Sequence, residues 1–261
     1  MNFLCPLCKT NKIRLSYSYK KLNHYECQKC FLVFQEIFKE KKAEVEKQLK
    51  SFYSKEYYQK TYKEPNIVFK QRKKQYILDK EILLDYFKDK KNKNILDYGC
   101  GNGLFLRLFK SKKFGYDYNP HVEKNNKITY LNINQIMKKK FDLIIMRGSV
   151  EHIHNFQKIL KLLFKSIKKN GLFFITATPN TSSLTFKLNR KKFNQNHQQH
   201  ILHFNHVNLS HFFLKNNFLN IGVHFQYFKT PYKNLSKDLM KLKKPGSSIL
   251  PPSPGNMMTL V

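Results

Sequence analysis

The chain has 261 residues, 41% of them hydrophobic, and its 23 Phe and 15 Tyr supply enough apolar surface for a packed core, which excludes an intrinsically disordered protein. No run approaches 18 uncharged apolar residues, and the start MNFLCPLCKT lacks the basic-then-apolar layout of a signal peptide, so we expect a cytoplasmic protein without membrane insertion. The formal charge of +32 leaves RNA as a candidate partner.

Lysine dominates this charge, because only five of the 49 basic residues are arginine. Surfaces that clamp phosphates or read bases usually favour the planar guanidinium of arginine. Asn, Ile, Phe and Tyr are abundant as well, a joint excess typical of A/T-rich coding. We therefore interpret the charge mainly as a compositional habit, while expecting salt-sensitive adhesion to polyanions.

Residues 1–38 contain four of the five cysteines, as the pairs Cys5-x2-Cys8 and Cys27-x2-Cys30. This spacing predicts a structural Zn²⁺ site, because two intervening residues let both thiolates of a pair reach one ion. Four thiolates close the coordination, so we expect a metal that holds the fold without chemistry. The alternatives are two disulfides, which a reducing compartment disfavours, or four unrelated thiols. The segment resembles a zinc ribbon, with an apolar shell of Phe3, Leu7, Phe31, Val33 and Phe34, and with His24 expected at the surface.

Residues 39–90 are interpreted as a helical connector. The stretch KEKKAEVEKQLK is charged, and an aromatic side is expected from Tyr53, Tyr57, Tyr58 and Tyr62. Apolar residues at helical spacing between Ile77 and Phe87 predict a helix directly before the glycine-rich stretch.

Residues 91–261 alternate between apolar runs and helical patterns, which predicts parallel βαβ units and an α/β fold. NILDYG, KFGYDYN, ITYLNI and the continuously apolar FDLIIMRG are predicted strands, and GLFLRLFK is a predicted helix. A helix from Phe156 is expected to stop at Asn170-Gly171 before the strand LFFITATP. A helix over 207–215 and strands in NIGVHFQYFKT and GNMMTLV are predicted to follow.

The stretch ILDYGCGNGLF places Gly99, Gly101 and Gly103 directly after a strand that ends near Asp97. This arrangement is typical of a backbone that approaches a ligand closely at the carboxyl edge of a parallel sheet. An acid at that position would repel phosphate and could receive a cationic amino group. The alternative is that Asp97 caps a helix and the glycines only form turns.

These motifs resemble those of the class I S-adenosylmethionine-dependent methyltransferases, whose first motif is commonly LDxGCGxG, over about residues 94–228. The resemblance implies a Rossmann-like, mostly parallel sheet with an antiparallel last strand. It implies that Asp97 faces the methionine part of the cofactor, that Asp117 accepts hydrogen bonds from the ribose hydroxyls, and that the turn from Arg147 to Glu151 passes the sulfonium. The implied cofactor-binding set is Asp97, Gly99, Cys100, Gly101, Gly103, Asp117, Tyr118, Asn132, Arg147, Gly148 and Ser149.

One position departs from the family pattern. Many members place an acid after the third strand to receive the adenine amino group, whereas this chain has YLNINQ. Asn132 could accept one hydrogen bond there through its side-chain oxygen, but without charge.

Methyl transfer is an in-line displacement that can require a general base near the acceptor. The motif SVEHIHN offers Glu151 and His152, and NQNHQQHILHFN offers His200 and His203, of which we choose His200. Each histidine has the alternative role of a surface or capping residue, and His152 could simply orient its loop.

We expect transfer of a methyl group to a small-molecule or glycan acceptor, with oxygen as the favoured atom. An RNA methyltransferase is the first alternative, because +32 would assist phosphate binding. A non-catalytic zinc-ribbon interaction module is the second.

Overall fold

The computed structural model describes residues 3–19, 22–39, 42–52, 54–56, 66–119, 126–190, 198–243 and 257–261. The chain divides into two compact units. The first, here called the cysteine unit, comprises residues 1–49, 150–154 and 177–260, and the second, the glycine unit, comprises residues 50–149, 155–176 and Val261.

The glycine unit is built on parallel strands. Strand β4 (Asn94–Tyr98) pairs with β5 (Lys112–Tyr116) on one side and with β7 (Phe141–Arg147) on the other. Strand β5 pairs with β6 (Thr129–Tyr130) and β7 with β8 (Ile167–Pro179), again in parallel. Every residue of β7 except its last is buried, as expected for a strand covered on both faces.

Among the described residues the larger sheet has seven strands in the order β10-β11-β8-β7-β4-β5-β6. Strands β10 (Val223–His224) and β11 (Met257–Leu260) pair antiparallel with each other. The expected α/β fold, mostly parallel with an antiparallel last strand, is confirmed.

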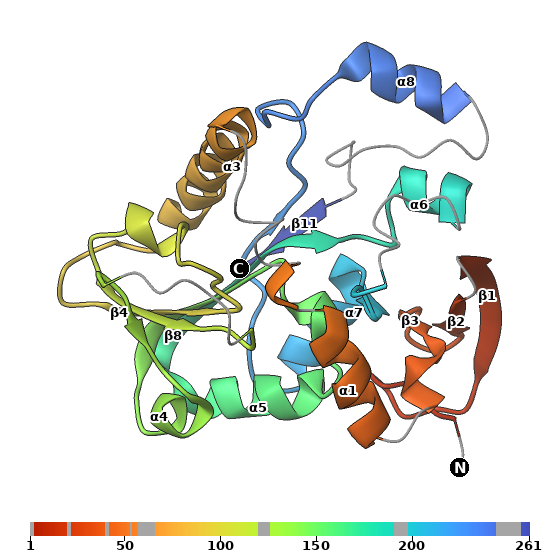
Figure 1. Cartoon of the computed structure of the whole chain (residues 1–261), viewed down its shortest axis with the longest axis horizontal. Coiled ribbons are helices and arrows are strands. Elements are labelled where there is room, and N and C mark those ends of the chain that lie inside the picture. Colours follow the sequence, from red (N-terminus) through yellow and green to blue (C-terminus); the bar gives the residue numbers. More distant parts are fainter. Residues whose placement is uncertain are drawn as a thin grey trace. The chain divides into compact units, whose positions relative to one another are not determined.

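Helices cover both faces of the glycine unit. Figure 1 shows α3 (Asn66–Leu84) on one side of β4, and α4 (Ile133–Met137) and α5 (Phe156–Ser166) on the other. Helix α5 buries Phe156, Leu160 and Leu163 at helical spacing, so it presents one apolar stripe. No helix in the described part of the chain is long and apolar enough to cross a bilayer.

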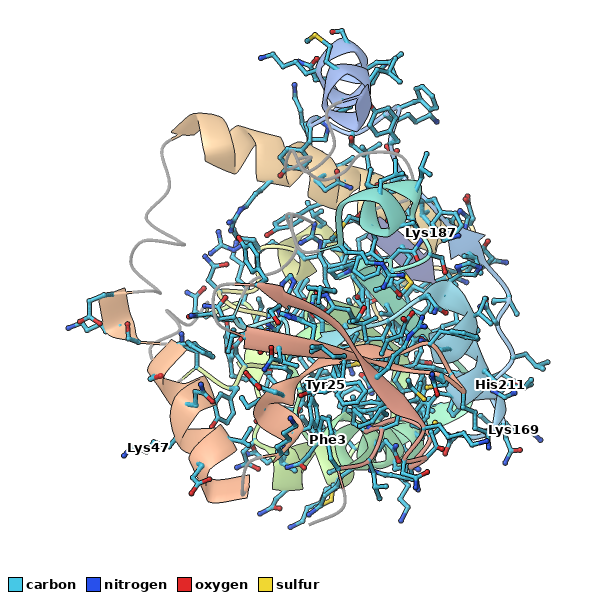
Figure 2. All side chains as sticks on the ribbon, turned by 90° about the vertical axis from the view of Figure 1, so that its right-hand side faces the viewer. Phe3, Tyr25, Lys47, Lys169, Lys187 and His211 are labelled. Atoms are coloured by element: carbon cyan, nitrogen blue, oxygen red, sulfur yellow. The ribbon has the colours of Figure 1, made fainter. Side chains whose placement is uncertain are left out.

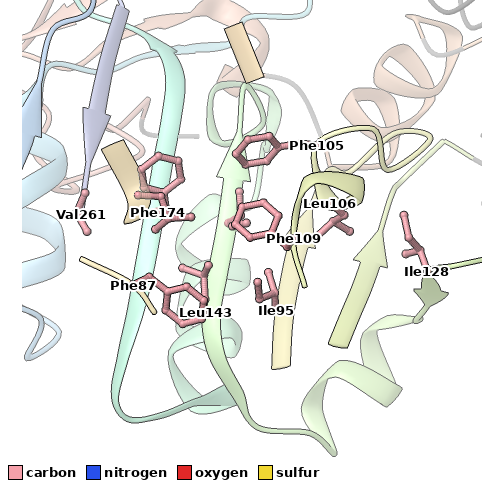
Figure 3. Close-up of a cluster of buried hydrophobic side chains, with 11 residues drawn as sticks. Phe87, Ile95, Phe105, Leu106, Phe109, Ile128, Leu143, Phe174 and Val261 are labelled. Carbon is pink, nitrogen blue, oxygen red and sulfur yellow. The ribbon is translucent and has the colours of Figure 1, made fainter. Parts of the chain in front are cut away.

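A cluster of buried hydrophobic side chains forms a core beside the strands of the larger sheet (Figure 3). Leu83 and Phe87, at and after the end of α3, pack with strand residues Ile95, Leu143 and Phe174. The segment after the glycines completes this cluster with Phe105, Leu106 and Phe109. Because this segment is buried against the sheet, it fixes the position of the glycine turn that precedes it.

The cysteine unit contains a four-stranded sheet in the order β1-β2-β3-β9. Its strands β1 (Ile13–Tyr19), β2 (Leu22–Cys27), β3 (Val33–Gln35) and β9 (Leu202–His203) are all antiparallel to their neighbours. Figure 2 shows Phe3 beside Tyr25, and their ring centroids lie 4.8 Å apart. The remaining helices are α1 (Lys42–Phe52), α6 (Leu184–Asn189), α7 (His206–Leu214) and α8 (Leu235–Lys243), with 3₁₀ turns at Glu36–Lys39, Leu106–Leu108 and Val150–His152.

The predicted helix over GLFLRLFK is wrong. Only the 3₁₀ turn Leu106–Leu108 forms there, because β5 already begins at Lys112 and leaves little chain for an α-helix. Gly103 moreover adopts a left-handed φ of +72°, which a right-handed helix does not accept.

The predicted end of the helix at Asn170-Gly171 is also wrong. Helix α5 ends at Ser166, because Ile167 is extended and pairs with Phe141 as the first residue of β8. Asn170 still takes a left-handed φ of +59°, so the pair forms a bend within the strand and does not cap the helix.

Other elements agree in kind and differ in length. The helix before the glycines is confirmed as α3, and the predicted strands ITYLNI and NIGVHFQYFKT shorten to two residues each, in β6 and β10. The tyrosines Tyr53, Tyr57, Tyr58 and Tyr62 lie outside the described residues.

Candidate functional site

The glycine turn after β4 is held in a conformation that only glycine accepts easily. Gly99, Gly101 and Gly103 have φ values of +89°, +53° and +72°, in the left-handed region. A Cβ on Gly99 would lie 2.7 Å from Cβ of Ser149, and one on Gly103 would collide with Ile128. The backbone of this turn therefore lies at the carboxyl edge of the sheet without a side chain at these three positions.

Asp97 lies beside this turn and is 2% exposed. Its Oδ1 is buried and has no hydrogen-bond partner among the described residues. Burial raises the pKa of Asp97 to about 7, the charge of Arg147 opposes the rise, and the charge of Asp117 adds to it. A buried carboxylate oxygen without a donor is rare in folded proteins, and it marks a place where a cationic or hydrogen-bond-donating ligand would be stabilised.

Asp117 follows β5, the strand next to β4, so both carboxylates lie at the same edge of the sheet. Its Oδ2 accepts a hydrogen bond from the backbone N–H of Gly101 at 2.7 Å, and its Oδ1 accepts one from Asn119 at 2.8 Å. Burial raises the pKa of Asp117, and these two hydrogen bonds oppose the rise. A carboxylate has about four acceptor sites, so Asp117 keeps capacity for two ligand hydroxyls.

Arg147 ends β7 and is engaged inside the glycine unit. Its Nε donates to Oδ2 of Asp79 on α3 at 2.7 Å, and its guanidinium lies 4.4 Å from the ring centroid of Tyr76. Burial is the largest single influence on the pKa of Arg147 and lowers it. Asp79, Tyr76 and Asp97 together outweigh burial, so the pKa is raised. Asp79 carries no recognisable signal in the sequence, because α3 also contains the acid Glu81 and only the fold shows that Asp79 is the buried one.

The residues next to Arg147 lie at the same turn. Gly148 has a left-handed φ of +56°, and its N–H donates to the carbonyl of Thr176. Ser149 is 8% exposed, and its Oγ has no hydrogen-bond partner among the described residues. Two polar atoms, Oγ of Ser149 and Oδ1 of Asp97, are therefore available beside the glycine turn.

The other predicted cofactor residues have mixed environments. Cys100 is a neutral thiol, because burial, followed by the charges of Asp97 and Asp117, raises its pKa. Tyr118 is 48% exposed. Asn132 is the N-cap of α4, where its Oδ1 accepts from the N–H of Gln135 at 2.9 Å. That oxygen is engaged in the cap, although it retains a second lone pair.

The four cysteines form two matching knuckles. The N–H of Lys9 donates to the carbonyl of Cys5, and the N–H of Phe31 donates to that of Cys27. Lys9 and Phe31 both have left-handed φ values, +60° and +58°, so the two turns repeat the same conformation. Phe31 is 59% exposed, and the prediction that it packs around the metal is wrong, because this turn directs it outward.

The sulfur atoms of the two knuckles converge. Sγ of Cys5 lies 3.6 Å from that of Cys30, and Sγ of Cys8 lies 3.4 Å from that of Cys27. All four lie within 4.8 Å of one another. Tetrahedral zinc with Zn–S bonds of about 2.3 Å needs sulfur separations of about 3.8 Å, so the four residues fit this ion. Hydrogen bonding with Cys30 lowers the pKa of Cys5 to about 5.

A second polar cluster lies in the cysteine unit and contains three of the predicted catalytic residues. The ligand atoms of Glu151, His152 and His200 lie within 4.8 Å of one another. Nδ1 of His152 is 2.9 Å from the carbonyl of Gln199, and its ring centroid is 4.6 Å from that of His200. Oγ1 of Thr178 donates to Oε2 of Glu151 at 3.4 Å. Thr178 was missed, because a threonine within an apolar strand carries no recognisable signal.

His203 and His24 extend this cluster toward the cysteines. His203 is fully buried, and its ring centroid lies 6.3 Å from that of His200 and 5.5 Å from that of His24. The prediction of a surface position for His24 is wrong. It is 1% exposed and stacks on Tyr17 at 4.5 Å, and burial lowers its pKa to about 4. The first histidine of the motif NQNHQQHILHFN, His197, lies outside the described residues.

The chain is similar to known proteins over the part that contains the glycine turn. A family model described as a methyltransferase domain matches residues 69–222. A ubiquinone biosynthesis O-methyltransferase of Pelagibacter ubique is 35% identical over 35% of this chain and 44% of its own length. The enzyme of the same name from Rickettsia typhi is 30% identical over 41% and 49%. The match thus spans about half the length of these curated relatives.

The fold has a similar solved structure. A chain in the complex between the Haloferax volcanii Trm112 methyltransferase activator and a candidate methyltransferase superposes with a TM-score of 0.56 at 10% identity. The superposition covers 82% of this chain and 96% of the Haloferax chain. At this identity the likeness supports the fold alone.

Proposed function

We propose that this chain, which belongs to the methyltransferase domain family, transfers a methyl group from S-adenosylmethionine to oxygen of a small-molecule or glycan acceptor. The name O-methyltransferase, carried by the relatives, supports oxygen as the acceptor atom and a small molecule as the acceptor class.

The buried Oδ1 of Asp97 is the observation that carries the proposal. A buried carboxyl oxygen without a partner among the described residues, beside a turn of glycines, fits the positively charged methionine part of the cofactor, which would favour its ionised form. Asp117 would bind the ribose hydroxyls with its remaining acceptor sites, and Gly99, Gly101 and Gly103 would allow close approach. Cys100, Tyr118, Asn132, Arg147, Gly148 and Ser149 complete the proposed set.

The chemistry that bound S-adenosylmethionine supplies is an electrophilic methyl group on a cationic sulfur. The protein then has to orient the acceptor and remove its proton. His200 is our proposed base, because its ring contacts His152, and Glu151 lies within reach to stabilise the resulting imidazolium. His203 would support the ring from the buried side.

The four cysteines are proposed to hold structural Zn²⁺ and to take no part in transfer. The division into a zinc ribbon over 1–38, a connector over 39–90 and a catalytic domain over 91–261 stays a proposal. A cytoplasmic location is proposed as well.

The test is methyl labelling. Full-length protein is incubated with methyl-labelled S-adenosylmethionine and with cell extract separated into metabolite, glycan and RNA pools. We expect label in the metabolite or glycan pool, and none with Asp97→Asn. Asp85→Asn is the matched control, because that carboxylate is exposed and lies outside the proposed cofactor-binding set.

Other outcomes select the alternatives. Label in RNA, with binding whose log–log salt slope indicates several phosphate contacts, would replace the acceptor class by RNA. If calorimetry detects no heat of binding at millimolar S-adenosylmethionine, the result selects the non-catalytic zinc-ribbon interaction module.

A further inference from the structure

Within the cysteine unit, strand β3 joins the four-cysteine module to residues 200–208, here called the histidine segment, which contain the proposed base. Strand β3 begins three residues after Cys30 and pairs with β9 on the side away from β2. Its Val33 lies opposite His203, and its Phe34 lies opposite Leu202. These four residues are fully buried, so β3 is an inner strand and forms the support of the histidine segment.

Gln35 makes the decisive contacts at the end of β3. Its backbone N–H donates to the carbonyl of Ile201 at 3.0 Å, and its side-chain Nε2 donates to the carbonyl of His200 at 3.0 Å. It is 2% exposed. One residue thus fixes two consecutive carbonyls, which sets the direction in which the His200 side chain leaves the backbone.

The second cysteine knuckle contacts the same segment further on. Nδ2 of Asn208 donates to the carbonyl of Cys30 at 3.2 Å. Asn208 also belongs to the capping box that begins α7, because it exchanges hydrogen bonds with Asn205. The histidine segment is therefore attached to the module before β9, through Gln35, and after β9, through Cys30.

We propose that Gln35 is a positioning residue for His200, and that metal in the four-cysteine site keeps the proposed base oriented through β3. The base assignment rests on the proposed function, and the attachment of the segment does not. Metal binding folds the knuckles, the knuckles fix where β3 starts, and β3 holds the carbonyls of residues 200 and 201.

Histidine labelling tests the attachment without turnover. Full-length wild type, Gln35→Met and Gln35→Ala are treated with diethyl pyrocarbonate, and each histidine is quantified by mass spectrometry. Methionine keeps the length of glutamine and lacks the donor. Gln28→Ala is the matched control, because Gln28 is an exposed glutamine of the same module.

We expect His200 and His203 to react about tenfold faster in both Gln35 variants, the factor that loss of one buried hydrogen bond gives to a local opening. His206 and His211 on α7 and the Gln28→Ala protein should react as in wild type. Unchanged labelling in the Gln35 variants would overturn the proposal. An equal rise at every histidine would do so as well, because it indicates general loosening.

The metal is tested in a second arm. Release of metal from wild type with an excess of a zinc chelator should expose His200, His203 and His24, and leave the affinity for S-adenosylmethionine unchanged. Unchanged labelling after metal release would break the link between the cysteines and the base. Absence of methyl transfer by wild type would instead reject the proposed function, which makes the two failures distinguishable.

Discussion

The backbone N–H of Gly101 donates to Oδ2 of Asp117 at 2.7 Å, so the glycine turn and the carboxylate on the next strand hold each other in place. Asp117→Ala removes both this bond and the proposed ribose acceptor. We expect the affinity for S-adenosylmethionine to fall by roughly 1.5–3 kcal/mol, the usual cost of losing a charged acceptor. Calorimetry measures it, and an unchanged dissociation constant would show that the ribose lies elsewhere.

Asp97 predicts a pH-dependent cofactor site. With its pKa at about 7, the carboxyl is largely protonated in the free protein below neutrality. A cationic ligand favours the ionised form, so affinity for S-adenosylmethionine should fall by up to about tenfold per pH unit below 7. Asp97→Asn should abolish this dependence together with most of the affinity.

Asp97 also predicts that the stability of the ligand-free protein falls as pH rises toward neutrality. The folded-state pKa of Asp97 lies above the unfolded value, so its contribution to stability is greatest below about pH 4 and is lost as pH rises to about 7. Asp97→Asn removes the cost of a buried charge, and we expect the ligand-free protein to gain up to about 4 kcal/mol at pH 8. Thermal unfolding checks this gain, and Asp85→Asn should leave the melting temperature unchanged.

His24 predicts the opposite slope at acid pH. Its folded-state pKa is about 4, below the unfolded value, so its contribution is complete above about pH 6.5 and is lost as pH falls to about 4. His24→Phe keeps a ring against Tyr17 and should flatten the loss of stability between these values. Urea unfolding at several pH values measures the slope, and the same substitution at the exposed His211 should not change it.

The four cysteines predict one Zn²⁺ per chain. Cys27→Ser should abolish metal binding and destabilise the cysteine unit, because a structural zinc site contributes folding free energy directly. Cys100→Ser is the control, because Cys100 lies at the glycine turn. Metal is counted with a chromophoric chelator after thiol release, and zinc retained by Cys27→Ser would contradict four-thiolate ligation.

The ion pair Arg147–Asp79, in which only the carboxylate is fully buried, predicts a clear destabilisation. Asp79→Asn leaves the partly buried guanidinium without its anionic partner, and we expect a loss of up to roughly 3 kcal/mol, the lower end of the cost for a fully buried pair. Lys73→Met, an exposed change on the same helix, should have little effect. A double-mutant cycle with Arg147→Met gives the coupling between the two charges, and additive effects would show that they do not interact.

The sequence predicted what depends on local patterns. Alternating apolar runs identified β4, β5, β7 and β8, and cysteine spacing identified the four residues whose sulfur atoms converge. Glycine spacing identified the turn beside Asp97. In each of these, the signal lies within a few residues of the element that it predicts.

What the sequence did not predict depends on distant residues. The burial of His24 arises from packing against Tyr17 and His203, and the hydrogen bond from Gln35 joins residues 165 positions apart. The early end of α5 likewise reflects competition from pairing of Ile167 with Phe141. Periodicity carries no information about such partners, and tertiary contacts override it.

The antiparallel pairing of β3 with β9 constrains how the protein folds during its synthesis. All four cysteines are available for the proposed metal once Cys30 leaves the ribosome, but Phe34 stays without its neighbour until Leu202 has been made. While the residues between Phe34 and Leu202 are being made, this inner strand therefore has an unpaired edge, because a non-local pairing cannot form early. We expect the nascent chain to depend on chaperones until Leu202 has emerged.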